Sequence, residues 1–184
     1  MDRRALLTFA PAALLAGCAA TPPASAPSIY LETVRRDGPL LIGAQPSVPD
    51  LVALQQAGVR SVFSLRTAEE LATLDHDPAA AATAQGLRYQ NHPIGGPAHP
   101  YTPALLQAFA DEMAATEGHM LLHCAGGGRA AQLYAAWLVS YRGLSPQQAL
   151  EQIRESGAWP LPMERLLGRP LSVDYADGTA PADD

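Results

Sequence analysis

Segments with strand character alternate with helical segments over most of this 184-residue chain. Strands are expected at 39–42, 59–65, 87–94 and 119–123. Helices are expected at 49–57, 78–85, 103–116, 129–141, 147–155 and 162–167. Strand–helix alternation is typical of a parallel sheet with helices on both faces. The sequence therefore predicts a three-layer α/β domain, with a central, mostly parallel sheet of roughly four or five strands flanked by helices.

Residues 1–17 have the composition of an export signal. Two arginines precede an apolar run at 5–16, which is shorter than the about 20 residues of a transmembrane helix. The run ends in Leu-Ala-Gly-Cys18, which resembles a bacterial lipobox. The resemblance implies a lipid anchor on Cys18 and a membrane-anchored lipoprotein on the periplasmic side, with Ala19 favouring the outer membrane. A plain signal peptide is the alternative, and the arginine pair leaves the Sec and twin-arginine export routes both open.

The rest of the chain divides into three parts. Residues 18–28 are rich in Ala, Pro and Ser, a composition typical of a flexible tether. The α/β domain is expected at 29–169, and the acidic tail at 170–184 is expected to be disordered. The net charge is −6 with no basic stripe, so nucleic acid is not an expected partner.

The chain shows no pattern typical of a metal site, and no cofactor is expected. Its five histidines lack zinc-ligand spacing, and its only cysteines are Cys18 and Cys124. If Cys18 carries lipid, Cys124 has no partner for an intramolecular disulfide.

The segment 119–130 places a glycine-rich loop between a buried strand and a helix. It reads His-Met-Leu-Leu-His-Cys-Ala-Gly-Gly-Gly-Arg-Ala. Successive glycines let backbone N–H groups point inward as an anion-binding nest, and the positive end of the helix lies at the same place. These dipoles favour the thiolate form of Cys124, and the Arg129 guanidinium can hold two oxygens of a tetrahedral anion. Ligands of parallel sheets bind beyond the carboxyl ends of the strands, where this loop lies.

His123 and Cys124, with Gly127 and Arg129, resemble the signature loop of cysteine-dependent protein tyrosine and dual-specificity phosphatases. The chain from about residue 30 to 160 is similar in particular to the bacterial phosphatase-like domain of beta-lactamase-hydrolase-like proteins. The segments that carry this second resemblance are 43–47, 57–62, 64–69 and 144–150. It implies a dual-specificity-phosphatase-like fold.

The resemblance also implies a role for each residue of the loop. Cys124 attacks the phosphorus atom, and His123 helps to set the thiolate. The oxyanion is held by Arg129 and by the amides of Ala125, Gly126, Gly127 and Gly128. The phosphocysteine intermediate is then hydrolysed. The implied partner is a small phosphorylated substrate or a phosphoprotein.

The loop departs from the phosphatase pattern in its spacing. Four residues separate Cys124 from Arg129, where these phosphatases have five, and Ala130 follows where they have Ser or Thr. The shorter loop also resembles that of rhodanese-type sulfurtransferases. This resemblance leaves open a persulfide carrier that acts on a sulfur anion.

Two further residues are candidates for the site. No carboxylate occurs at 94–99, where the general acid of a phosphatase is expected, so His99 is the candidate acid. Arg66 follows a strand and is a candidate to add positive charge to the pocket, unless it pairs with Glu69 or Glu70.

Three functions are therefore open. The first is a phosphatase-like hydrolase of phosphomonoesters outside the cytoplasm, and the second is the sulfurtransferase. The third is a non-catalytic anion-binding lipoprotein. A tight glycine turn with a buried, inert Cys124 is the plain structural alternative for the loop. An exposed thiolate in an oxidising compartment is open to sulfenic acid formation, so an enzyme of this kind is expected to need a reductant.

Overall fold

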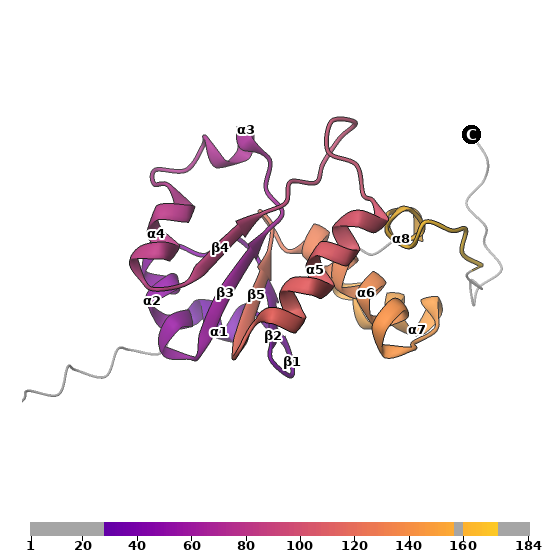
Figure 1. Cartoon of the computed structure of the whole chain (residues 1–184), viewed down its shortest axis with the longest axis horizontal. Helices are drawn as coiled ribbons and strands as arrows, with labels where there is room; N and C mark the ends of the chain where they lie inside the picture. Colours follow the sequence, from indigo (N-terminus) through magenta and orange to yellow (C-terminus); the bar gives the residue numbers. More distant parts are fainter. Residues whose placement is uncertain (1–27, 157–159, 173–184) are drawn as a thin grey trace, which may run out of the picture.

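The computed structural model describes residues 28–156 and 160–172. The centre of the molecule is a five-stranded sheet in the order β1-β2-β5-β3-β4 (Figure 1). The strands are β1 (Arg35–Asp37), β2 (Leu40–Gly43), β3 (Val59–Ser64), β4 (Arg88–Asn91) and β5 (His119–His123). β1 runs antiparallel to β2, and the other neighbouring strands pair in parallel. The predicted fold class is confirmed.

Helices cover both faces of the sheet (Figure 1). One face carries α1 (Ile29–Thr33), α2 (Val48–Gln56) and α4 (Pro78–Ala84). The other face carries α5 (Pro103–Ala115) and α6 (Gly128–Arg142), against which α7 (Pro146–Gln152) and α8 (Pro160–Leu167) pack. The short α3 (Ala68–Leu71) follows β3 at the carboxyl end of the sheet.

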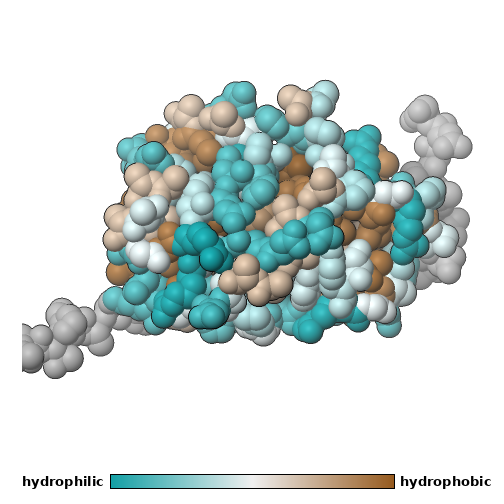
Figure 2. Space-filling model, viewed as in Figure 1, coloured by the Kyte–Doolittle hydropathy of each residue, from teal (hydrophilic) through white to brown (hydrophobic). Residues whose placement is uncertain are grey.

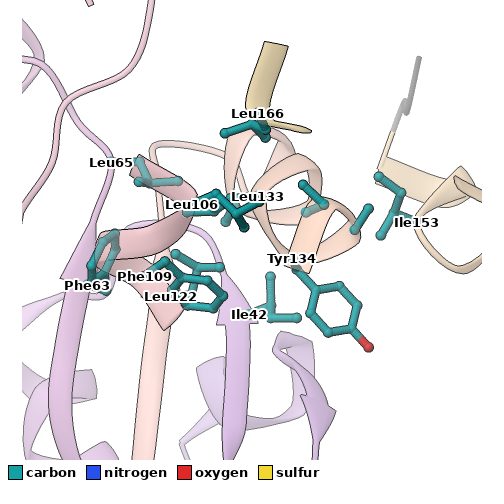
Figure 3. Packing of buried hydrophobic residues seen from close by; sticks show 14 of the residues in the cluster. Ile42, Phe63, Leu65, Leu106, Phe109, Leu122, Leu133, Tyr134, Ile153 and Leu166 are labelled. Carbon is teal, nitrogen blue, oxygen red and sulfur yellow. The ribbon is translucent and has the colours of Figure 1, made fainter. Parts of the chain in front are cut away.

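Alternating side chains of the strands form a hydrophobic core on each side of the sheet, because successive residues of a strand point to opposite faces. Phe63 and Leu122 pack with Phe109 on the α5–α6 side, where the two phenylalanine rings meet edge to face at 5.5 Å (Figure 3). Val62 and Leu121 belong to the second core, on the α2–α4 side. Both cores fix β5 in the middle of the sheet, and β5 leads directly into the glycine-rich loop.

Three elements were not predicted: α1, β1 and α3. β1 has the sequence Arg-Arg-Asp without an apolar residue, so hydrophobic alternation gives no sign of it, and it forms only by pairing with β2. The strand predicted at 87–94 covers only Arg88–Asn91. The helix predicted at 147–155 ends at Gln152 and is followed by a 3-10 turn at Arg154–Ser156.

The face of the molecule in Figure 2 is covered mainly by hydrophilic residues, with smaller hydrophobic patches between them. No helix within the two described ranges has both the length and the apolar character needed to cross a bilayer. The predicted signal peptide, the lipidation site Cys18 and the tail beyond residue 172 lie outside the described residues.

Candidate active site

The glycine-rich loop lies between the loops that follow β2 and β3. β5 is the middle strand of these three, and His123 is in register with Gly43 on one side and with Ser64 on the other. The loops are tied together by backbone hydrogen bonds, from the Gln45 N–H to the Ala125 carbonyl at 3.1 Å and from the Leu65 N–H to the His123 carbonyl at 2.9 Å. Side chains from all three loops therefore meet at one edge of the sheet.

Gly127 closes the loop onto the sulfur of Cys124. Its N–H donates to Cys124 Sγ at 3.0 Å, and its backbone has a φ of +94°, in the left-handed region that favours glycine. A Cβ at this position would meet the backbone of Gly43 at 3.5 Å, an ordinary van der Waals distance, so the backbone conformation and not crowding favours glycine here. Gly127 is the N-cap of α6, which places the unpaired N–H groups of the first helical turn beside the loop.

Cys124 is nearly inaccessible to solvent, with 2% of its surface exposed, and it packs in the α5–α6 core. The expectation of an exposed thiolate is therefore wrong. The reason is that Cys124 continues β5 directly, so its side chain takes the same face as Leu122. The sulfur is nevertheless in polar contact, because it accepts the hydrogen bond from Gly127 and lies close enough to Arg129 to help raise the pKa of that guanidinium.

Arg129 is fixed by the Glu70 carboxylate and by the backbone carbonyls of Leu65 and Ile94. Nη1 donates to Glu70 Oε2 at 2.8 Å and to the Ile94 carbonyl at 2.6 Å, and Nη2 donates to Glu70 Oε1 at 2.6 Å. A guanidinium has five N–H donors. Glu70 and Ile94 use both donors of Nη1 and one of Nη2, which leaves the Nε and Nη2 edge for an oxyanion. This is the edge with which arginine makes bidentate contacts to phosphate.

Glu70 is the functional residue that the sequence did not assign correctly. The sequence suggests only a pairing of Glu70 with Arg66, whereas in the structure the Glu70 carboxylate forms a bidentate pair with Arg129. The hydrogen bond from Arg129, followed by the hydrogen bond from the Thr67 N–H and the charges of the two arginines, lowers the pKa of Glu70 to about 2 against the cost of burial. A signal for it exists in the sequence. Thr67 and Glu70 form a reciprocal capping box at the start of α3, which fixes where the carboxylate lies.

Arg66 lies beneath the loops and not in an open pocket. Only 7% of its surface is exposed. Nη1 donates to Gln45 Oε1 at 3.1 Å and Nη2 to the Glu70 carbonyl at 2.9 Å. Arg66 therefore adds positive charge next to Glu70 while it holds the β2 and β3 loops together.

His123 is fully buried behind the loop. Its Nδ1 lies 3.2 Å from the Cys124 carbonyl, and because a carbonyl only accepts, Nδ1 carries the proton. Burial lowers the pKa of His123 to about 4, so the ring is neutral at pH 7. His123 can therefore orient the Cys124 backbone, but it does not supply a positive charge to the thiolate.

His99 lies in a tight loop above Arg129. The Gly95 N–H donates to the His99 carbonyl at 2.8 Å, and a Cβ on Gly95 would lie 3.4 Å from Arg129 Nη1. The pKa of Glu69 is lowered by hydrogen bonds from its own amide and from Thr67, with a smaller contribution from the charge of His99. His99 also lines a cavity together with residues at the start of α5, among them Thr102 and Leu105. No hydrogen bond within the described residues joins His99 to Cys124 or Arg129.

The site is thus built from Cys124, Gly127 and Arg129, with His123 behind it and Arg66 beneath it. Among the residues that the structure describes, no group of three or more His, Cys, Asp or Glu side chains is placed to hold a metal ion.

The sequence resemblance to beta-lactamase-hydrolase-like proteins is found in direct comparison. The protein of that name from Xylella fastidiosa (strain Temecula1) is 38% identical over 98 residues, which are 52% of this chain and 22% of the relative. The one from Agrobacterium fabrum (strain C58) is 35% identical over 106 residues, which are 56% of this chain and 24% of the relative. This chain therefore spans less than a quarter of the length of these relatives. No family model matches it.

Solved structures resemble about three quarters of this chain. PTPMT1 in complex with PI(5)P superposes with a TM-score of 0.63 at 24% identity, covering 74% of this chain and 93% of PTPMT1. The active form of Tk-PTP gives 0.62 at 22% identity, covering 75% and 98%. The fold is dual-specificity-phosphatase-like. P. aeruginosa TpbA in complex with pTyr shares this phosphatase-like fold, with a TM-score of 0.57 at 23% identity over 79% of this chain and 85% of TpbA.

Proposed function

We propose that this chain is a cysteine-dependent hydrolase of phosphomonoesters. The observation that carries the proposal is the approach of Cys124 Sγ, the Gly127 N–H and Arg129 at the start of α6, with Arg129 fixed by Glu70 so that one edge stays available. The phosphatase-like fold supports it, because structures of that fold hold PI(5)P and pTyr. The 38% identity to a beta-lactamase-hydrolase-like protein over 98 residues supports it further.

The reaction proceeds in two displacements. Cys124 Sγ forms a bond to phosphorus as the bond from phosphorus to the alcohol oxygen breaks, and the amides of 125–128 and the free edge of Arg129 hold the equatorial oxygens. Water then attacks the phosphocysteine and releases inorganic phosphate and the thiolate. We propose His99 as the group that gives the leaving alkoxide its proton.

The proposed cellular setting is the periplasmic side of a membrane. Cys18 carries the lipid, residues 18–28 form the tether, and α1 begins at Ile29 directly after it. Radiolabelled palmitate incorporation that is lost in Cys18→Ala tests the anchor, and an unlabelled full-length chain would refute it.

Turnover of p-nitrophenyl phosphate and of phosphorylated peptides tests the reaction. We expect turnover that is abolished by Cys124→Ser and reduced at least about a hundredfold by Arg129→Lys, because Lys cannot make the bidentate contact. Trapping a phosphocysteine in rapidly quenched protein would support the mechanism. Equal turnover in wild type and Cys124→Ser would refute it.

A sulfurtransferase is the second candidate, favoured by the four-residue spacing between Cys124 and Arg129. In this reaction the outer sulfur of thiosulfate is transferred to Cys124 Sγ, sulfite leaves, and cyanide accepts the sulfur as thiocyanate. A mass increase of one sulfur on Cys124 after incubation with thiosulfate supports this reaction. Unmodified Cys124 together with Cys124-dependent phosphate release decides for the hydrolase.

A further inference from the structure

A cavity of about 600 Å³ opens beside the signature loop. It lies between the end of β2, the first turns of α6 and the turn that follows α7. Gly126, Gly127 and Gly128 form one wall, and polar side chains from β1 and from the turn after α7 form the opposite wall. Pockets of roughly 300–1,000 Å³ are typical of sites for small molecules.

The glycines keep this wall open. A Cβ built on Gly126 meets no atom within 4 Å, and one built on Gly128 meets only the Ser156 carbonyl at 3.6 Å. Side chains would fit at both positions, so packing does not demand glycine there, and a larger residue would project into open space. The loop peptides that are expected to bind phosphate can therefore be approached by a ligand that extends into the cavity.

The opposite wall is organised around Arg35. Its Nη2 donates to Gln152 Oε1 at 2.9 Å, its Nη1 donates to the Gln152 carbonyl, and its guanidinium carbon lies 5.3 Å from the centre of the Tyr134 ring. The Tyr134 ring lies beside Ile42 with its hydroxyl directed away from the labelled leucines and phenylalanines (Figure 3), and this hydroxyl donates to Asp37 Oδ2 at 3.1 Å. Arg35 is thus held in place before any ligand arrives.

The polar groups of the cavity match a ligand that carries several hydroxyls. Arg35 supplies N–H donors, Glu155 supplies a carboxylate and Ser156 a hydroxyl. The Thr33 hydroxyl donates to the Tyr30 carbonyl and can still accept a hydrogen bond. Vicinal hydroxyls both donate and accept, so they can satisfy cation and carboxylate together. An aromatic leaving group would cover these groups without bonding them, which costs binding energy.

We propose that this cavity is the leaving-group subsite of the enzyme and that its substrates are phosphate monoesters of polyols or sugars. The phosphate occupies the loop at Cys124 and Arg129, and the alcohol part extends past the three glycines towards Arg35 and Glu155. This inference rests on the proposed function, because the loop has to bind the phosphate.

The test compares myo-inositol monophosphate with p-nitrophenyl phosphate, which bears no hydroxyl on its leaving group. In Arg35→Gln and in Glu155→Gln we expect the ratio of kcat/KM for the first substrate to that for the second to fall about tenfold. Matched controls are Arg36→Gln, the neighbouring exposed arginine of β1, and Glu151→Gln, which pairs with Arg154. Neither control residue lines the cavity, so both should keep the wild-type ratio.

A binding measurement separates this proposal from the proposed function. Calorimetry of myo-inositol monophosphate with Cys124→Ser should show an affinity that falls about tenfold when Glu155→Gln is added, whether or not the wild type turns over any ester. Thermal unfolding of each variant checks that it is folded. If binding depends on Glu155 but Cys124-dependent turnover is absent, the hydrolase fails and the subsite stands. If aryl phosphate is hydrolysed and the ratio is unchanged in both variants, the subsite is refuted.

Two more outcomes define the ligand. The polyol assignment would be overturned if Arg35→Gln and Glu155→Gln lowered kcat/KM for a phosphotyrosyl peptide but left kcat/KM for myo-inositol monophosphate unchanged. Phosphatidylinositol monophosphate in phosphatidylcholine vesicles presents an inositol phosphomonoester on a lipid. Comparing it with free myo-inositol monophosphate separates a lipid substrate from a soluble ester. A variant effect with free inositol monophosphate supports a soluble polyol phosphate, and an effect only with vesicles supports a lipid headgroup.

Discussion

The carboxylate of Glu70 holds the catalytic arginine in place, so Glu70→Gln tests both the stability and the geometry of the site. Glutamine keeps one oxygen that can accept from Arg129 and replaces the other by an NH₂ group, which faces an N–H donor. The substitution removes the negative charge that pairs with Arg129 and that the charge of Arg66 also stabilises, and it keeps nearly the same volume.

The magnitude follows from the pKa of Glu70, which the hydrogen bond from Arg129, the hydrogen bond from the Thr67 N–H and the charges of the two arginines together lower from 4.5 to about 2. At about 1.36 kcal/mol for each pKa unit, the pair contributes at most about 3 kcal/mol at pH 7. The side chains of Arg129 and Glu70 are 20% and 30% exposed, and solvent screening reduces this to about 2 kcal/mol. Because the folded-state pKa is lowered, the stabilisation is complete above about pH 4.5 and is lost as the pH falls towards about 2.

Urea denaturation of wild type and Glu70→Gln from pH 7 down to pH 2 measures this contribution. The difference in free energy of unfolding should be about 2 kcal/mol at pH 7 and should close at low pH. Turnover of an aryl phosphate should fall about tenfold or more, because the free edge of Arg129 is no longer held. Glu69→Gln, the exposed neighbour, is the matched control. The reasoning is wrong if Glu70→Gln and wild type unfold at the same urea concentration at pH 7, or if their difference does not change with pH.

Three further predictions concern the glycine-rich loop and two buried residues, His123 and Glu112. Gly127→Ala should lower the free energy of unfolding by about 1–2 kcal/mol because of the left-handed φ, whereas Gly126→Ala, which has no such φ and meets open space, should cost less than half of that in urea denaturation. Burial lowers the pKa of His123 to about 4, so between pH 6.5 and 4 this histidine is protonated in the unfolded chain but not in the folded one. Up to about 3 kcal/mol of stability is therefore lost as the pH falls from 6.5 to 4. In His123→Asn the free energy of unfolding should depend less on pH over this range. The buried Glu112 accepts from Ser61 at 2.5 Å and from Arg88 at 2.8 Å, so Glu112→Gln should cost about 3 kcal/mol in the same assay, with kcat/KM of the folded protein unchanged.

Much of the fold could be predicted because its strands and helices bury alternating or periodic apolar residues. The residues of β3 and β5 are almost all buried, so their sequences read as apolar strands. β1 and α3 could not be found in this way. Their residues are exposed or half-buried, so they show no apolar pattern. β1 forms because it pairs with β2, and α3 forms because Thr67 and Glu70 cap its start.

The site was predictable to the extent that its residues are adjacent in the sequence. Cys124, Gly127 and Arg129 belong to one strand–loop–helix unit, so their spacing in the sequence predicts that they lie close together. The carboxylate that fixes Arg129 comes from 59 residues earlier in the chain, and only the sheet order brings β3 next to β5. The burial of Cys124 was missed for a similar reason, because the α5–α6 core that covers it is assembled from distant segments.

The charges of the site explain why a glycine-rich loop is needed. Arg66 and Arg129 bring two positive charges, and Glu70 cancels one of them. A Cys124 thiolate would cancel the other, so a phosphate dianion would enter a site without net charge of its own. Its attraction must then come from dipoles aimed at the oxygens, which are the loop amides and the first turn of α6. Among these amides, the Gly127 N–H is directed at Cys124 Sγ, from a backbone conformation that favours glycine. We therefore expect the backbone of Gly127 to contribute to anion binding alongside the two arginines.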